Sequence, residues 1–226
     1  MWIRDRINIL FKERRIYLAR PVNEEKRQER RKRILKEAVV LFAESGYSNT
    51  TTAIIAKSVG VTPGTIFQYF PSKEALFYAA VLEPLADIQV KSLACLQQEG
   101  TPGVLIKNMV KEQFDHIYFY TNELRLAQSV LGQRIRFPEL TEKVLESIKV
   151  MTDKIESVYA KGQSMGEFNK SFSPAMISRA YISFLNGVAL TLGEEIIHHP
   201  EWENLKGHAF YLFAPIQSKE KLEESK

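Results

Sequence analysis

Two groups of side chains in this 226-residue chain have the types and spacing to do chemistry. The first, Gly162-Gln163-Ser164-Met165-Gly166, matches the GxSxG pattern of serine hydrolases, and His208 lies downstream as a candidate base. That pattern needs a sharp turn between a strand and a helix, whereas these residues end a long helix-periodic stretch. We therefore interpret the segment as a connection between helices, with hydrolysis as the less favoured alternative.

The second group is a set of hydroxyl and amide side chains that lie on one face of a short predicted helix. Thr62, Thr65 and Gln68 remain on that face when the neighbouring apolar residues point inward at helical spacing. The inward set is Ile55, Val59, Val61, Ile66 and Tyr69. Such polar groups can read base edges in a major groove, so the sequence predicts a DNA-reading helix, capped by Thr62 and opened by Pro63.

Two short helices that meet at Gly60 must hold this polar face in place. Ala56 is small enough for the two helices to touch, and Gly60 occupies a turn that needs a positive φ. A plain helical hairpin would share the turn glycine. The capped second helix and the spaced apolar positions together favour a helix-turn-helix that binds DNA.

The distribution of charge supports a polyanionic partner for the N-terminal part. Residues 1–75 contain 15 basic and 8 acidic side chains, whereas residues 76–226 contain 16 and 19. Six basic residues lie in the first half of the first predicted helix and either approach phosphates or form a solvated face: Lys26, Arg27, Arg30, Arg31, Lys32 and Arg33. A protein that coats DNA without sequence preference is the alternative that charge alone would allow.

The histidines and the cysteine give no metal-ligand pattern. His116, His198, His199 and His208 lack the spacing to carboxylates or to Cys95 that a structural metal site needs. A single cysteine forms no internal disulfide and fits a reducing compartment, and the apolar runs are shorter than the ~20 residues of a membrane helix. We expect a cytoplasmic protein without cofactor, metal or membrane span.

The run from Ile34 to Leu82 resembles the N-terminal domain of TetR-type transcriptional regulators. The matching stretches are Ile34 to Ala38, Leu41 to Tyr47, Thr50 to Thr52, Ile55-Ala56, Gly60-Val61, Gly64 to Phe70 and Ser72 to Leu76. The resemblance implies an all-α fold, with a three-helix DNA-binding domain followed by a helical effector-binding and dimerisation domain. It also implies a homodimeric, ligand-responsive repressor that binds a palindromic operator and is released by a small, largely apolar effector.

The expected DNA contacts combine the motif with this resemblance. Thr52, Tyr69 and Lys73 should hold phosphates, and Gly64 should permit close approach to the duplex. Phe67 stands where the family commonly has a tyrosine, so its ring should pack on a sugar or a thymine methyl group. The full predicted set is Thr52, Thr62, Pro63, Gly64, Thr65, Phe67, Gln68, Tyr69 and Lys73.

The effector site is expected among the helices after the fourth, because TetR-like proteins bind small molecules there. An aromatic stripe at helical spacing is more often core than pocket, so these residues are an expectation carried by the resemblance. They are Phe114, His116, Tyr118, Tyr120, Gln128, Met151, Tyr159, Tyr181, Phe184 and Asn186.

Caps, prolines and periodicity predict the domain limits and the helices. Residues 1–23 are a basic extension: a disordered arm, an additional helix, or the product of a start codon placed too far upstream. A DNA-binding domain over 24–71, a helical domain over 72–216 and a polar tail over 217–226 follow. Helices are expected over 24–45, 72–98 with a kink at Pro84, 102–120, 122–134, 138–161, 174–197 and 200–214, and no sheet.

The helix over 174–197 is apolar around most of its circumference, so it needs cover on most sides. A second subunit is the simplest cover for the face that its own domain leaves open. The predicted dimer interface consists of Ala180, Leu185, Val188, Leu192, Leu205, Phe210 and Phe213.

Overall fold

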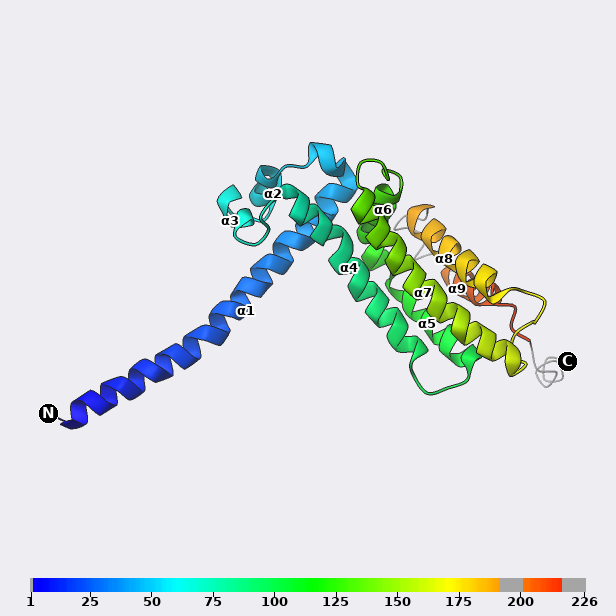
Figure 1. Ribbon diagram of the computed structural model, residues 1–226, viewed down its shortest axis with the longest axis horizontal. Coiled ribbons are helices and arrows are strands. Elements are labelled where there is room, and N and C mark those ends of the chain that lie inside the picture. Colours follow the sequence, from blue (N-terminus) through cyan, green and yellow to red (C-terminus); the bar gives the residue numbers. More distant parts are fainter. Residues whose placement is uncertain (1, 192–200, 217–226) are drawn as a thin grey trace. The chain divides into compact units, whose positions relative to one another are not determined.

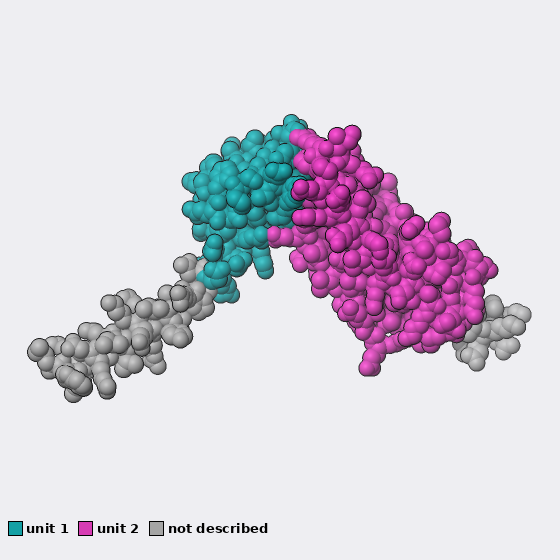
Figure 2. Space-filling view, viewed as in Figure 1, with its two compact units in different colours: residues 1–80 teal, residues 81–226 magenta. Residues whose placement is uncertain are grey.

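The computed structural model describes residues 2–191 and 201–216, with side chains from residue 24 onward except Tyr118. These residues form α-helices and one 3₁₀ helix and contain no strand, which confirms the all-α prediction (Figure 1). The chain divides into two compact units, residues 1–80 and 81–226 (Figure 2).

The described helices are distributed over the two units. Unit 1 contains α1 (Trp2–Asn49), α2 (Thr52–Ser58), α3 (Pro63–Phe67) and the start of α4 (Lys73–Leu96). Unit 2 contains the rest of α4 and then α5 (Pro102–His116), η1 (Ile117–Tyr120), α6 (Thr121–Leu131), α7 (Pro138–Ser164), α8 (Pro174–Thr191) and α9 (Glu201–Tyr211).

Most predicted helices are present, with differences at their ends. α1 begins at Trp2 and not at Glu24, and Gly46, with φ 73°, interrupts it where the first helix was expected to end. α4 continues through Pro84. The last residues of the predicted 174–197 helix, including Leu192, and the predicted tail over 217–226 lie outside the described residues.

The core of unit 1 draws on the first turns of α4 as well as on the helix-turn-helix. The rings of Phe42 on α1 and Phe77 on α4 pack edge to face with 5.0 Å between centroids. Leu76 and Ala80 are also fully buried. The boundary between the units therefore falls inside α4, after Ala80, whereas the sequence placed it before this helix, at residues 71 and 72.

Unit 2 is a bundle in which α7 packs against α5, α6 and α8, and α9 packs against α5. Its core contains an aromatic cluster in which the Tyr159 and Phe168 rings stack at 4.9 Å between centroids. The Tyr181 and Phe213 rings lie 5.0 Å apart in the same cluster. Phe213 is fully buried in its own subunit, which contradicts its predicted place in a dimer interface, because a residue without exposed surface has none left to bury.

The loop between α7 and α8 folds back over the end of α7, and this packing explains why both glycines of the GxSxG pattern are glycine. A Cβ atom on Gly162 would lie 2.3 Å from Phe168 Cδ2, so only glycine leaves room for this ring. Gly166 has φ +80°, which favours glycine as well. Ser164 donates its hydroxyl hydrogen to the carbonyl oxygen of Lys161 at 2.7 Å, and the residues before it are helical, as the predicted connection between helices requires.

Among the described helices, we find none that combines the length and the apolar character needed to cross a membrane.

Replacing Gly162 with alanine should destabilise the protein by about 1–3 kcal/mol, the usual cost of overpacking a core. The added methyl group would meet the Phe168 ring and, at 3.1 Å, Pro102 Cβ, neither of which can swing away. Thermal unfolding measures the change. Gly207→Ala on α9 is the matched control, because its Cβ would meet nothing within 4 Å. Equal melting temperatures for both variants would contradict this account of Gly162.

Candidate nucleic-acid interface and ligand cavity

The first helix of the motif, α2, is capped and anchored by its own sequence. The Thr51 hydroxyl accepts a hydrogen bond from the Ile54 amide at 3.2 Å, which satisfies one of the free amides at the helix start. Ile55 and Ala56 are fully buried. α2 therefore has a fixed start and a fixed inner face, and Ala56 lies in the core as the sequence predicts.

The turn after α2 closes in a Schellman arrangement. The Val61 amide donates to the Ala56 carbonyl at 2.8 Å, and the Gly60 amide donates to the Lys57 carbonyl at 3.2 Å. Gly60 has φ +69°, the left-handed conformation that was predicted for it. Arg33 on α1 donates from Nη2 to the Val59 carbonyl oxygen at 2.7 Å and so ties the end of α2 to α1. These bonds fix the direction in which the chain enters α3.

The second helix, α3, has one buried face and one exposed face. Ile66 is fully buried, while Pro63, Gly64 and Gln68 are exposed and 49% of the Phe67 surface is open to solvent. Of the residues predicted to point inward, Ile55 and Ile66 are fully buried, and three are only partly buried: Val59, Val61 and Tyr69. The predicted polar face is thus on the surface of unit 1.

The role of Thr62 differs from the predicted one. Thr62 is the N-cap residue of α3, but its side chain makes no capping bond to the helix. Its Oγ1 instead lies 3.0 Å from Oγ1 of Thr65, so the two hydroxyl groups form a pair on the surface. Pro63 needs no amide partner, and the Thr65 amide donates to the Thr62 carbonyl at 2.9 Å. The Thr62 hydroxyl therefore remains at the surface of α3.

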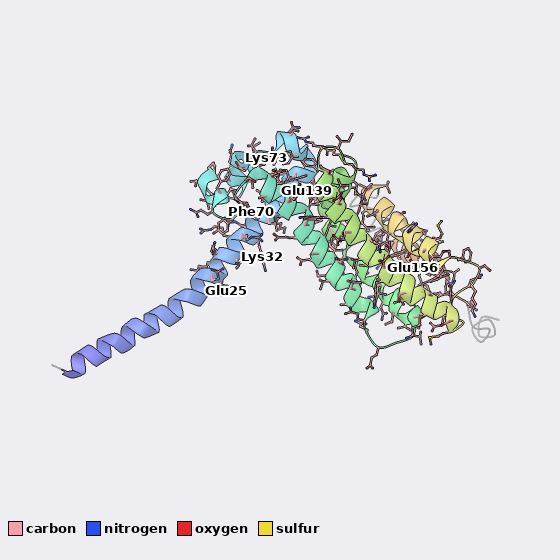
Figure 3. The ribbon with its side chains drawn as sticks, viewed as in Figure 1. Glu25, Lys32, Phe70, Lys73, Glu139 and Glu156 are labelled. Carbon is pink, nitrogen blue, oxygen red and sulfur yellow. The ribbon has the colours of Figure 1, made fainter. Side chains whose placement is uncertain are left out.

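Phe70, which the sequence reading did not single out, anchors the end of the motif. It is only 3% exposed, its amide donates to the Ile66 carbonyl at 3.0 Å, and the Arg31 guanidinium lies 4.8 Å from its ring centroid. Its position four residues after Ile66 is the signal that could have identified it. Arg31 and Arg33 thus serve the fold, while Lys32 beside them is exposed on α1 (Figure 3).

Lys73 and Thr52, two of the predicted phosphate contacts, both lie at helix starts. Lys73 is the first residue of α4, and its Nζ lies 4.3 Å from the Tyr47 ring centroid (Figure 3). The Ser72 hydroxyl accepts a hydrogen bond from the Ala75 amide at 3.0 Å and so caps the start of α4. Thr52, the first residue of α2, is partly exposed.

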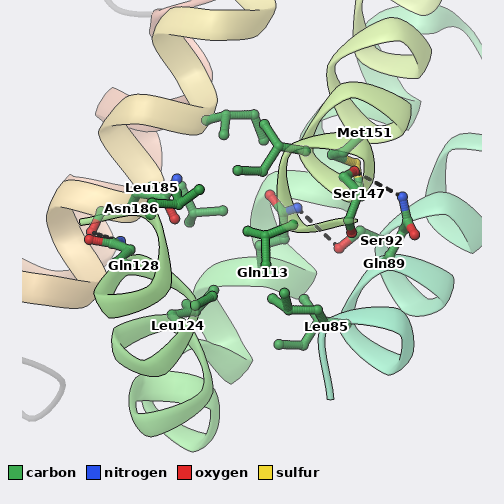
Figure 4. A pocket seen from close by; sticks show the side chains of 16 residues that line it. Leu85, Gln89, Ser92, Gln113, Leu124, Gln128, Ser147, Met151, Leu185 and Asn186 are labelled. Carbon is green, nitrogen blue, oxygen red and sulfur yellow. Dashed lines mark hydrogen bonds between the residues drawn. The ribbon is translucent and has the colours of Figure 1, made fainter. Parts of the chain in front are cut away.

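Unit 2 contains a cavity of about 100 Å³ between α4, α5, α6, α7 and α8 (Figure 4). Three of the predicted effector residues line it: Gln128, Met151 and Asn186. The rest of its lining was not foreseen, because the sequence does not say which faces of five helices converge. Those residues are Leu85, Ile88, Gln89, Ser92, Gln113, Leu124, Ala127, Leu131, Val144, Ser147, Ile148, Ile182 and Leu185.

The remaining predicted effector residues lie elsewhere. Phe114 and Tyr159 are buried in the core, where Phe114 contacts Trp202 with 5.4 Å between ring centroids. Tyr181 is buried and donates its hydroxyl hydrogen to Gln113 Oε1. The Nδ1 atom of His116 lies 3.2 Å from Glu112 Oε1, and the Tyr120 hydroxyl accepts a hydrogen bond from Lys91. Phe184 lines a groove between α8 and α9. The Tyr118 side chain lies outside the described residues.

The predicted dimer residues are also divided by the structure. Leu185 lines the cavity and Val188 is 7% exposed, so neither offers much surface to a partner. Ala180 is exposed, whereas Leu205 and Phe210 are partly buried. The apolar residues that α8 does expose are Met176, at 64%, and Leu190, at 44%.

A helix-turn-helix with an exposed polar recognition face, followed by a helical domain with an internal cavity, defines a DNA-binding transcriptional regulator. Residues 34–80 match the family described as bacterial regulatory proteins, tetR family. The helix-turn-helix unit of this chain is therefore of the TetR type.

Known relatives agree with this assignment. The chain is 25% identical over 168 residues to the HTH-type transcriptional regulator UidR of Escherichia coli K12, covering 74% of this chain and 84% of UidR. It is 26% identical over 142 residues to the fatty acid metabolism regulator protein of Bacillus subtilis, covering 61% and 70%. The fold matches the fatty acid degradation regulator FadR of Bacillus halodurans with a TM-score of 0.62 and 21% identity, over 81% and 94% of the two chains.

Two glycine variants should separate folding of the motif from contact with DNA. Gly60→Ala forces a side chain into the left-handed conformation and should destabilise unit 1 by about 1–2 kcal/mol. In Gly64→Ala the new Cβ has open space, since its nearest atom is Thr62 Oγ1 at 3.9 Å, so the stability should be kept or raised. DNA binding should nevertheless weaken, because the added methyl group lies where the α3 backbone approaches the duplex. Thermal unfolding and fluorescence anisotropy with duplex DNA measure the two effects. Full DNA affinity in Gly64→Ala would contradict close approach at α3.

Proposed function

We propose that this regulator is a ligand-responsive repressor that acts in the cytoplasm, binds a palindromic operator as a homodimer and leaves it when a small, largely apolar effector binds. The observation that carries the DNA-binding part is the outward polar face of α3, which the burial of Ile66 and the Gly60 turn hold in place. The cavity in unit 2 supports the ligand-responsive part.

The base-reading role falls to three polar side chains of α3. Thr62, Thr65 and Gln68 carry groups that can donate and accept hydrogen bonds at base edges, and Gly64 lets the α3 backbone approach the duplex. Phe67, with about half of its surface open, packs on a sugar or on a thymine methyl group. Thr52, Tyr69 and Lys73 hold phosphates and so position α3 in the groove.

The homodimer rests on the exposed face of α8. Met176, Ala180 and Leu190 lie on one side of this helix, and Gly187 on the same side has open space where a Cβ would be. An exposed apolar stripe with small residues in its middle suits close packing against a second copy. This interface replaces the predicted contributions of Leu185, Val188 and Phe213.

The effector acts through α4. Leu85, Ile88, Gln89 and Ser92 bring this helix to the cavity wall, and Lys73 is the first residue of the same helix. When the ligand and DNA favour different positions of α4, the ligand weakens DNA binding by the same factor by which DNA weakens ligand binding. The relatives named for fatty acid metabolism and degradation favour an apolar effector, as does the largely apolar lining.

Selection of bound fragments from a random DNA pool tests the proposal. A palindrome should emerge whose half-sites are about 34 Å apart, one helical turn, or somewhat more. Light scattering at micromolar concentration should report twice the chain mass. Equal affinity for random duplex would instead identify a nonspecific DNA-coating protein. A mass equal to that of one chain would contradict the homodimer and, with it, a pair of recognition helices on one operator.

Two substitutions at the proposed DNA contacts should change binding to the selected operator in different ways. Lys73→Ala should weaken binding to every sequence and reduce the salt slope by about one, since one phosphate contact is lost. Gln68→Ala should relax preference at one position by about 1–3 kcal/mol and leave the slope unchanged. Anisotropy titrations at several salt concentrations separate the two effects. The same loss for both variants on all sequences would refute this division of roles.

A further inference from the structure

The cavity in unit 2 is lined by uncharged side chains. Its sixteen lining residues include apolar side chains, three glutamines, one asparagine and two serines, but no acidic, basic or aromatic side chain. An ion placed there would lose its hydration without finding a counter-charge, which is strongly unfavourable. The lining therefore selects for a neutral guest, and its polar groups decide how that guest is oriented.

A chain of hydrogen bonds runs from the core to the cavity wall. Tyr181 is fully buried, and burial raises the pKa of its phenol above the ordinary value, so the hydroxyl keeps its hydrogen. Its acceptor is Gln113 Oε1. Gln113 in turn donates from Nε2 to Ser92 Oγ at 3.0 Å (Figure 4).

The direction of this chain follows from Tyr181. A buried phenol must donate to something, and in the described part of the chain Gln113 is its hydrogen-bond partner. The side-chain amide of Gln113 must then point its oxygen toward Tyr181 and its nitrogen toward Ser92. Ser92 thus accepts a hydrogen bond, and among the described residues no acceptor takes its own hydroxyl hydrogen. Ser92 is 2% exposed and lines the cavity, so this hydrogen is available to a guest.

Resting on the proposed function of this cavity as the effector site, we infer that it binds an uncharged molecule that presents an acceptor oxygen, such as a carbonyl, to the hydroxyl of Ser92. The chain Tyr181, Gln113 and Ser92 is the device that sets this preference. Tyr181 and Gln113 act as positioning residues, and Ser92 makes the contact.

Four probes of similar size test the inference by calorimetry or ligand-observed NMR on the full-length protein. Cyclohexanone has the acceptor oxygen, and methylenecyclohexane has the same shape without it. Cyclohexylammonium and cyclohexanecarboxylate add a charge. Both charged probes should bind at least about tenfold more weakly than the ketone, because the cavity offers no counter-charge.

Ser92→Ala should weaken cyclohexanone binding about threefold to tenfold, the effect of one hydrogen bond, and should not weaken binding of methylenecyclohexane. Tyr181→Phe should do the same, because the released Gln113 amide can turn its oxygen to Ser92 and take the hydroxyl hydrogen. Ser178→Ala is the matched control: Ser178 is also buried, donates to the Ala175 carbonyl at 3.1 Å and does not line the cavity. It should leave the ratio of the two affinities unchanged.

Three results would overturn the inference: a charged probe that binds as well as the ketone, a ketone-to-hydrocarbon ratio unaffected by Ser92→Ala, or binding of none of the four probes. None of these results depends on whether the protein selects a palindrome from random DNA. Failure of the ligand inference is therefore distinguishable from failure of the proposed DNA-binding function. The ratio is the deciding readout, because a general loss of packing would weaken both neutral probes together.

Discussion

The DNA-binding unit depends on the packing of α3 against α2, in which Ile66 is fully buried. α3 is only five residues long, far too short to be stable alone, so its orientation comes from this burial and from the Schellman turn at Gly60. Because the inner face is fixed, the hydroxyl pair of Thr62 and Thr65 and the amide of Gln68 must lie on the outer side of the helix.

Two arginines on α1 contribute to the same constraint. Arg33 binds the carbonyl at the end of α2, and Arg31 covers the ring of Phe70 just after α3. Charged residues that look like a phosphate-binding run in the sequence are thus partly used to hold the motif together. An arginine can do this because its planar guanidinium both donates to a carbonyl and stacks on an aromatic ring. The positive charge remains close to the motif and still favours a polyanion.

Unit 2 separates two kinds of side chain that sequence reasoning could not tell apart. Its aromatic residues form the core, where Tyr159, Phe168 and Phe213 pack against one another. The cavity is lined by aliphatic residues and amides instead. Large rings fill space efficiently, so their concentration in the core leaves the open volume to smaller side chains. This is why Tyr159 and Phe114 lie in the core, although the family resemblance suggested an aromatic pocket.

The amino-acid sequence by itself determined these local features: the prolines at helix starts, the glycine turn, and which residues around α3 face inward and which face outward. These depend on neighbours within a few residues, so periodicity and residue type are enough to find them. Tertiary structure alone decided where α4 passes from one unit to the other, which faces of five helices enclose the cavity, and that Phe213 is core. Such features depend on residues far apart in the chain, as with Gln113 and Tyr181, whose pairing no local pattern encodes.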